Sequence, residues 1–390
     1  MKYKLSEIAL FNPTETLKKG TLAKKIGMDR LQSFCRDIPD YEFAEFSGGT
    51  KFRNGDTIMA RITPCLENGK TAKVNILDTE EVGFGSTEYI VFRAIEGITD
   101  EDYLYYLVCS PIVRDIAIKS MVGSSGRQRV QTDVVKGIEI ELPTFDEQRK
   151  IGLLLKSLDD KIAINNKINE NLEQQMKAIF NKFISERSVT SKTTVENVVL
   201  TANTGADAIQ KAPIVDYDTG IRCVRVGDMT NNRSFHDWGY TKVTEEVFNR
   251  YQLHKNDIIV TRTASLGLNT IISEDLQAVY NNGLIRLSIN DKKALPLFIY
   301  RQFQTDDFSN YIARIESETS VRPNMKINYL LKYEFELPSL DEQNELINLF
   351  QPMNEQQSLL INENKMLESL RDTLLPRLMS GELDVSDIDL

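Results

Sequence analysis

Histidine is almost absent from this sequence, since only His236 and His254 occur among 390 residues and both lie in the C-terminal half. A histidine-based active site therefore cannot be present in both halves, and neither histidine has neighbours that resemble a metal-ligand set or a catalytic triad. Glycine-rich phosphate-binding motifs, an H-E-x-x-H zinc motif and the Asn/Asp-Pro-Pro-aromatic tetrad of amino-methyltransferases are also missing. These absences argue against an enzyme of any of these classes.

Cysteine is also scarce. Cys35, Cys65, Cys109 and Cys223 show no C-x-x-C spacing, which favours reduced, mostly buried thiols over a disulfide framework. No run approaches the roughly 18 apolar residues of a membrane span, and the first residues lack the apolar core of a signal peptide. We therefore expect a cytoplasmic globular protein without membrane contact.

Basic charge is not in excess either, because 47 Lys and Arg face 57 Asp and Glu and the net charge is −10. The imbalance is local: residues 1–143 carry a net charge of −2, residues 144–187 of +1, residues 188–338 of −1 and residues 339–390 of −8. The two large regions are nearly neutral, so each can hold a basic face opposite an acidic one. DNA binding by these regions is compatible with the overall acidity.

The sequence does contain an internal repeat. ELPTFDEQ at 141–148 returns as ELPSLDEQ at 336–343, an offset of 195 residues. In each copy a proline follows a strand-like segment. Thr144 and Glu147 then have the spacing of a capping box, and Ser339 begins the same motif in the second copy. We therefore expect a long helix to begin at both places and the chain to be a duplication.

Both helices show the heptad spacing of a coiled coil. The expected seam of the first is Ile151, Leu155, Leu158, Ile162, Asn165, Asn169, Leu172, Met176, Ile179 and Phe183, and that of the second is Met353, Gln357, Leu360, Asn364, Leu367, Leu374 and Leu378. Asn169 and Asn364 correspond at the offset of 195, and we interpret them as polar residues that align the helices, with a wet-edge position as the alternative. A helix of about 40 residues is about 60 Å long, enough for domains at its ends to address DNA half-sites a helical turn apart.

The two regions outside the helices have mixed α/β patterns. We predict strands at 57–62, 73–77, 89–94, 138–142, 220–229 and 333–337, and a helix over about 101–119 that Pro111 interrupts. IEIEL (138–142) and YEFEL (333–337) alternate strictly, as strands with one buried face do. Near the C-terminus we expect Pro376 to break the helix and the tail VSDIDL to be loosely ordered.

The two halves also match at arginine-containing loops. GDTIMARITP (55–64) resembles NDIIVTRTAS (256–265) and gives Arg61 and Arg262 the same place, while Arg127 and Arg322 coincide at the offset of 195. Arginine and lysine bind guanine edges, and asparagine and glutamine bind adenine. Between the matched segments the sequences diverge, as expected if each half recognises something different. For any one of these residues taken alone, a solvated charge or a salt-bridge partner is the alternative.

We therefore predict that basic and polar side chains gathered in loops contact DNA. In the first region these are Lys18, Lys19, Lys24, Lys25, Arg53, Arg61, Thr63, Asn68, Lys70, Ser124, Ser125, Arg127, Gln128 and Arg129. In the second region they are Arg222, Arg225, Arg233, Arg262, Thr263, Ser265, Ser320, Arg322 and Asn324.

With these motifs the chain resembles the specificity subunit of type I restriction–modification systems. The resemblance is carried by residues 51–72, 141–173, 220–229, 336–343 and 374–383. It implies an α+β fold in which two mixed α/β target-recognition domains form a pseudo-twofold repeat, separated by two long helices in an antiparallel coiled coil. The expected parts are recognition domain 1 (1–143), helix 1 (144–187), recognition domain 2 (188–338) and helix 2 with an acidic tail (339–390). Pro352 falls inside the second helix, where the first helix has Ser157. We therefore expect the second helix not to be straight and continuous at its start.

The resemblance also implies a function. Each domain would bind one half of a bipartite double-stranded DNA target in the major groove, and the subunit would have no catalytic activity, metal or cofactor of its own. Two modification (adenine methyltransferase) subunits and two restriction subunits would assemble on it and use S-adenosylmethionine, ATP and Mg²⁺. A coiled-coil adaptor that binds proteins and no DNA is the alternative, but it leaves the two divergent regions with duplicated arginine loops without a purpose.

Overall fold

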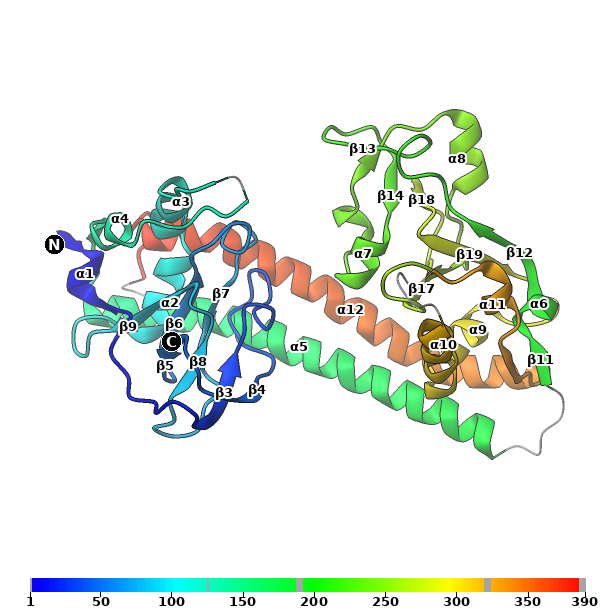
Figure 1. Ribbon diagram of the computed structural model, residues 1–390, viewed down its shortest axis with the longest axis horizontal. Helices are drawn as coiled ribbons and strands as arrows, with labels where there is room; N and C mark the ends of the chain where they lie inside the picture. The colour runs from blue at the N-terminus through cyan, green and yellow to red at the C-terminus, as the bar shows by residue number, and fades with distance from the viewer. Residues whose placement is uncertain (1, 125, 187–191, 319–323, 386–390) are drawn as a thin grey trace. The chain divides into compact units, whose positions relative to one another are not determined.

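The computed structural model describes residues 2–124, 126–186, 192–318 and 324–385 (Figure 1). The chain forms two compact units: unit 1 comprises Met1–Asn169 and Leu359–Leu390, and unit 2 comprises Glu170–Ser358. Two long helices, α5 (Phe145–Ser185) and α12 (Leu340–Met379), each contribute to both units. The units divide within these helices, and the domain boundaries at 143, 187 and 338 stay predictions.

Unit 1 is a mixed α/β structure. Its strands are β1 (Lys2–Lys4), β2 (Ala9–Phe11), β3 (Leu22–Ile26), β4 (Glu42–Glu45), β5 (Thr50–Phe52), β6 (Thr57–Ala60), β7 (Thr71–Lys73), β8 (Gly83–Gly85), β9 (Tyr89–Ala94) and β10 (Glu139–Glu141). Its shorter helices are α1 (Leu5–Ile8), α2 (Glu101–Cys109), α3 (Pro111–Lys119) and α4 (Thr132–Lys136). The sheets have the orders β2-β9-β6-β7 and β4-β3-β8-β5, and β1 pairs with β10.

The central sheet of unit 1 is buried on both faces. Met59 and Ile90 belong to a core shared with α2 and α5, whereas their neighbours Ile58 and Val91 belong to a core shared with the smaller sheet. Because successive side chains of a strand point to opposite faces, this sheet joins the helices to the smaller sheet.

Unit 2 repeats this plan. Its strands are β11 (Lys192–Thr194), β12 (Val199–Thr204), β13 (Ile214–Val215), β14 (Arg222–Val224), β15 (Tyr240–Thr241), β16 (Ile258–Thr261), β17 (Asn269–Ile271), β18 (Ala278–Tyr280), β19 (Leu284–Ile289) and β20 (Glu334–Glu336). Its shorter helices are α6 (Val195–Val198), α7 (Val226–Thr230), η1 (Phe235–Asp237), α8 (Glu245–Tyr251), α9 (Pro296–Gln302), α10 (Asp306–Glu318) and α11 (Ile327–Leu331).

The central sheet is duplicated and the smaller sheet is not. The order β12-β19-β16-β17 repeats β2-β9-β6-β7, and the pair β11–β20 repeats β1–β10. In the smaller sheets β14 runs parallel to β18 as β3 does to β8, but β18 lies at an edge whereas β8 also pairs with β5. The two units therefore share the central sheet and the terminal strand pair and differ in the smaller sheet, which confirms the predicted α+β duplication.

Both predicted capping boxes form. The Thr144 N–H donates to the Glu147 carboxylate at 2.7 Å and the Glu147 N–H to Thr144 Oγ1 at 3.3 Å, and Ser339 makes the equivalent bonds at 2.8 and 3.4 Å. The repeated sequence at the two helix starts also has a second structural role. The buried Gln148 side chain donates to the Pro143 carbonyl at 3.1 Å and accepts from the Asp100 N–H at 3.0 Å, which ties the helix start to α2. At the start of α12 the Gln343 side chain repeats both bonds, donating to the Pro338 carbonyl at 2.8 Å and accepting from the Leu295 N–H before α9 at 2.8 Å.

Every predicted seam position on α5 and α12 is buried or half-buried. Within unit 1 the two helices are antiparallel, because Asp159 contacts Arg371 while the later Asn165 contacts the earlier Asn364. The Asn165 Nδ2 donates to the Asn364 Oδ1 at 2.9 Å. For Asn364, a position that aligns the helices is therefore supported over a wet edge, since only 8% of this residue is exposed.

Two predicted strands are wrong in extent. The strand expected at 73–77 is β7, which ends at Lys73, because beyond it the Leu77 N–H bonds the Asn54 side chain at 3.0 Å instead of a neighbouring strand. The strand expected at 220–229 ends at Val224, where α7 follows. The expected strands at 57–62, 89–94, 138–142 and 333–337 are confirmed at their cores.

Proline has different effects at three positions. Pro111 starts α3 and separates it from α2, as predicted. The expected break at Pro376 is wrong and α12 is also continuous at Pro352, because the helix extends through both to Met379. Met379 in the last turn of α12 and Val385 beyond the helix are both buried in the unit 1 core. Most of the VSDIDL tail lies outside the described residues.

The four cysteines are free thiols, with Cys223 buried and the other three half-buried. None of the described helices is long and apolar enough to cross a membrane.

Candidate nucleic-acid interface

Arg61 directly follows β6, and its main chain is bonded on both sides. Its N–H donates to the Glu88 carbonyl at 2.9 Å, and its carbonyl accepts from the Val130 N–H at 2.9 Å. Glu88 belongs to the turn that enters β9, and Val130 lies just before α4. Two segments distant in sequence therefore fix the backbone of residue 61 at the end of the sheet.

The side chains of Arg61, Glu88 and Arg129 form a charged cluster at this place. Arg129 donates to the Glu88 carboxylate from Nε at 2.9 Å and from Nη2 at 2.6 Å, and the Arg61 Nε lies 3.6 Å from the same carboxylate. Hydrogen bonds from Arg129 lower the pKa of Glu88, partial burial opposes the shift, and the charges of Arg129 and Arg61 add to it. The carboxylate therefore orients two guanidinium groups at neutral pH.

A hairpin lies beside this cluster. Val122 and Arg129 exchange main-chain hydrogen bonds of 3.0 and 2.9 Å, and the Thr63 N–H donates to the Gln128 carbonyl at 3.0 Å. At the tip Arg127 is exposed, and its guanidinium makes no hydrogen bond or ion pair with the described part of the chain. Ser124 is exposed as well, while Ser125 lies outside the described residues. The sequence-predicted loops around residues 61 and 127 are thus brought together.

Arg262 in unit 2 has the same main-chain setting. Its N–H donates to the Gly283 carbonyl at 2.9 Å, and its carbonyl accepts from the Met325 N–H at 2.8 Å. Gly283 and Met325 stand 195 positions after Glu88 and Val130. The duplicated sequence therefore builds the same backbone support for one arginine in each unit.

The side-chain partners of the two arginines differ. Arg262 donates from Nε to the Met325 carbonyl at 3.1 Å, from Nη1 to the Asn282 carbonyl at 3.1 Å and from Nη2 to the Asn324 Oδ1 at 2.8 Å. Burial lowers the pKa of Arg262. Asn324 takes the place that Arg129 has in unit 1 and also pairs with Thr263 in a β-bridge. Ser320 and Arg322 lie outside the described residues.

Three predicted cations outside the loops around Arg61 and Arg262 are bound by groups of their own unit. Lys24 is buried and lies 2.9 Å from Asp78 and 3.0 Å from Glu81. Arg222 donates to the Tyr240 hydroxyl at 2.9 Å and stacks on that ring, 4.2 Å from its centroid. Arg225, expected in a strand, precedes α7 and donates to the carbonyls of Cys223 and Ala212 at 3.0 and 3.2 Å.

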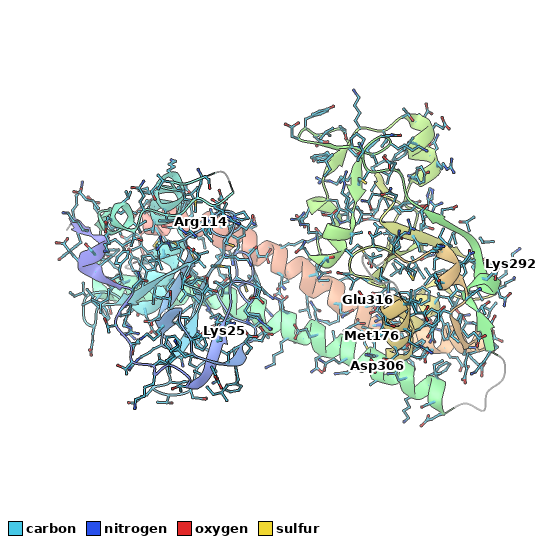
Figure 2. All side chains as sticks on the ribbon, in the orientation of Figure 1. Lys25, Arg114, Met176, Lys292, Asp306 and Glu316 are labelled. Carbon is cyan, nitrogen blue, oxygen red and sulfur yellow. The ribbon has the colours of Figure 1, made fainter. Side chains whose placement is uncertain are left out.

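The remaining predicted residues are at least partly accessible, and several have a partner on the surface. Lys25 pairs with Glu42 at 2.8 Å, Arg53 with Glu15 at 2.8 Å and Arg233 with Asp228 at 3.3 Å, and Lys70 donates to the Met28 carbonyl at 2.7 Å (Lys25 is labelled in Figure 2). Lys18, Lys19 and Asn68 are exposed, and Ser265 is half-buried.

The sequence did not single out two residues that shape the unit 1 surface. Glu88 orients Arg61 and Arg129. The sequence does contain a signal for it, because the equivalent position of the second half, 195 residues later, holds a glycine, Gly283. Arg114 on α3 donates to the Glu67 carbonyl at 2.9 Å and lies 5.1 Å from the Phe34 ring centroid (Figure 2). No local motif marks this second residue.

These two surfaces carry groups suited to base edges. A guanidinium can bind O6 and N7 of guanine, a carboxylate can accept from the cytosine amino group, and a carboxamide can pair with adenine. In residues 2–124, 126–186, 192–318 and 324–385, no three His, Cys, Asp or Glu side chains are grouped so that they could hold a metal ion.

Comparison with known proteins gives a consistent match. The family model described as the type I restriction modification DNA specificity domain matches residues 1–174 and 202–369. The chain is 20% identical over 328 residues to the type I restriction enzyme MjaVIII specificity subunit of Methanocaldococcus jannaschii, covering 79% of this chain and 76% of that protein. It is 24% identical over 414 residues to the HindI specificity subunit of Haemophilus influenzae, covering 85% and 87%. A solved S subunit from M. genitalium has the same fold, with a TM-score of 0.54, 13% identity and coverage of 97% and 96%.

Proposed function

This chain belongs to the type I restriction–modification DNA specificity family, and on that premise we propose that each recognition region binds one half of a bipartite double-stranded DNA sequence in the major groove. The chain is a specificity subunit with two target-recognition domains and is not itself catalytic. The two half-sites would then be bound by the surfaces around Arg61 and Arg262.

One observation carries this proposal. Arg61 and Arg262 have the same pair of main-chain hydrogen bonds, whereas the side chains around them differ. Shared support with divergent neighbours is what two surfaces need if they dock on DNA in the same manner and distinguish different bases. Direct discrimination between bases requires protein side chains at the base edges, while docking requires contacts to the sugar-phosphate backbone of the DNA.

The proposed contacts fall into two groups. Base-edge contacts are assigned to Arg61, Thr63, Glu88, Arg127, Gln128 and Arg129 in the first region and to Arg262, Thr263, Arg322 and Asn324 in the second. Phosphate contacts are assigned to Lys18, Lys19, Lys25, Arg53, Asn68, Lys70, Ser124, Ser125, Arg233, Ser265 and Ser320. Lys24, Arg222 and Arg225 are assigned a structural role, because they lie outside the loops around Arg61 and Arg262 and their cationic groups have internal partners.

The proposed partners are two modification subunits and two restriction subunits that assemble with this chain in the cytoplasm. In this proposal S-adenosylmethionine, ATP and Mg²⁺ are bound by those subunits, and this chain determines which DNA sequence the complex recognises.

The test is DNA binding by the chain in complex with its modification subunits. Methylation-site mapping first defines the target, and fluorescence anisotropy then measures Kd for that duplex and for a scrambled duplex at several salt concentrations. Arg127→Ala should weaken binding to the target by about 1–3 kcal/mol if this residue contacts a base edge. If it contacts phosphate, both duplexes should lose affinity equally and the salt slope should fall by about 1.

Lys292→Ala is the matched control. Lys292 is exposed beyond the end of β19 (Figure 2), and Arg262 lies at the opposite end of that strand because Thr261 pairs with Leu284. The control should leave Kd unchanged. A complex that binds target and scrambled duplexes equally would refute the proposal and favour the protein-adaptor alternative.

A further inference from the structure

A buried ionic network joins three elements of unit 1. The Tyr106 hydroxyl on α2 donates to the Asp159 Oδ2 on α5 at 2.6 Å, and the Arg371 Nη1 on α12 donates to the Asp159 Oδ1 at 2.8 Å. Only 7% of the Asp159 side chain and 12% of the Arg371 side chain are exposed. The carboxylate is therefore compensated by one guanidinium that comes from the other long helix.

A different network joins the corresponding elements of unit 2. Arg301 on α9 donates from Nη2 to the Asn354 Oδ1 on α12 at 3.1 Å and to the Met176 sulfur on α5 at 3.2 Å, and from Nη1 to the Glu173 carboxylate. Met176 is fully buried, and Arg301 is 4% exposed. Here the recognition region supplies the cation, and the facing helix supplies a neutral thioether (Met176 in Figure 2).

The two networks occupy equivalent positions of the repeat. At the offset of 195, Tyr106 corresponds to Arg301, Asp159 to Asn354 and Met176 to Arg371. Glu173 corresponds to Glu368, so this acidic position is shared. The same three places thus hold a phenol, a carboxylate and a guanidinium in one unit, and a guanidinium, a carboxamide and a thioether in the other.

This difference bears on which helices can pair. In a symmetric pairing of two α5 helices, Met176 would stand where Arg371 stands, and Asp159 would be buried without a cation. In a symmetric pairing of two α12 helices, Arg371 would replace Met176 beside the buried Arg301, which brings two guanidinium groups together. Removing the partner of a buried charge is strongly destabilising, and like charges in a buried site repel.

We propose that these two networks are a selectivity device for helix pairing, so that α5 accepts α12 and rejects a second copy of itself. The unequal halves of the repeat thereby pair with each other and not with the same half of another chain. The proposal concerns assembly of the chain and is independent of DNA binding.

The test reproduces both symmetric pairings inside the full-length chain without cutting it. The variant R371M/M176R exchanges the two helix residues, so that Asp159 faces methionine and Arg301 faces arginine while composition is unchanged. Its melting temperature should fall by roughly 10 °C, since breaking a buried ion pair is costly and each unit has about 200 residues. The control K167N/N362K exchanges two exposed residues of the same helices, also at equivalent positions, and should melt as the wild type does.

A third variant separates selectivity from a simple loss of stability. Adding Y106R, D159N, R301Y and N354D to R371M/M176R moves each complete network into the other unit, with Glu173 and Glu368 already in place. This six-residue exchange should recover most of the lost melting temperature, measured by calorimetry and circular dichroism. If R371M/M176R melts as the wild type does, or if the six-residue exchange is no more stable than R371M/M176R, the proposal is wrong.

Discussion

The two equivalent arginines should respond differently to the same substitution. Arg262→Ala removes three hydrogen bonds, to the carbonyls of Met325 and Asn282 and to the Asn324 side chain. Arg61→Ala removes one contact, at 3.6 Å from Glu88. We therefore expect Arg262 to contribute to the free energy of unfolding and Arg61 to contribute little.

The magnitudes follow from the number and exposure of these contacts. A hydrogen bond contributes about 1 kcal/mol net, and the partial exposure of the Arg262 side chain reduces the sum of three to about 1–2 kcal/mol. For a unit of about 200 residues this corresponds to a melting temperature lower by about 2–8 °C. A single partly exposed ion pair such as that of Arg61 contributes under about 1 kcal/mol.

Differential scanning calorimetry of the full-length variants measures both effects. Arg262→Lys is the matched control, because it keeps the charge but cannot reproduce the geometry of three bonds, and it should regain only part of the loss. A loss for Arg61→Ala equal to or larger than that for Arg262→Ala would refute the assignment. DNA affinities of Arg262→Ala should be measured well below its melting temperature, so that lost structure is not taken for a lost base contact.

Exchanging residues 1–143 for the same region of another family member should change one half-site and leave the other unaltered in methylation-site mapping; a change in both halves would contradict independent recognition. Matched seven-residue insertions after Asn169 and Asn364 add about 10 Å to each helix, so the preferred non-specific spacer should lengthen by about 3 base pairs. Recovery of the original spacer would mean that the helices do not set it. Pro352→Ala should raise the melting temperature, because alanine restores a helix N–H and removes a cost of up to about 3 kcal/mol, and a lower value would show that proline is required there. Glu88 has a lowered pKa, so its contribution to stability is present above the unfolded pKa of about 4.3 and lost as pH falls through the lower folded value. Glu88→Gln should abolish that part of the acid dependence seen in pH-dependent melting.

Much of the fold was accessible from the sequence because its signals are local. The capping boxes at Thr144 and Ser339 act over three residues, and the heptad seam repeats over three and four, so neither needs knowledge of distant segments. The alternation at 138–142 and 333–337 is equally local. The duplication at an offset of 195 then extended each local inference from one half of the chain to the other.

Strand ends and helix interruptions depended on distant partners. The strand expected at 73–77 stops at Lys73. Beyond it the Leu77 N–H donates to the Asn54 side chain, and no pattern within the segment indicates that. Pro376 does not end α12, because Met379 beyond it is buried in a core assembled from unit 1. Local propensity was overruled in both cases by contacts from residues far away in the chain.

The sequence by itself determined that two arginines stand at equivalent places, and that two capped helices follow two recognition regions. Only the tertiary structure decided what those arginines contact: Arg61 faces Glu88, whereas Arg262 is bonded to Asn324. The physical reason is that capping boxes and heptad seams form between neighbours in sequence, while the environment of a side chain is supplied by segments that meet only after folding. Two residues of the same type at repeated positions can therefore have different roles.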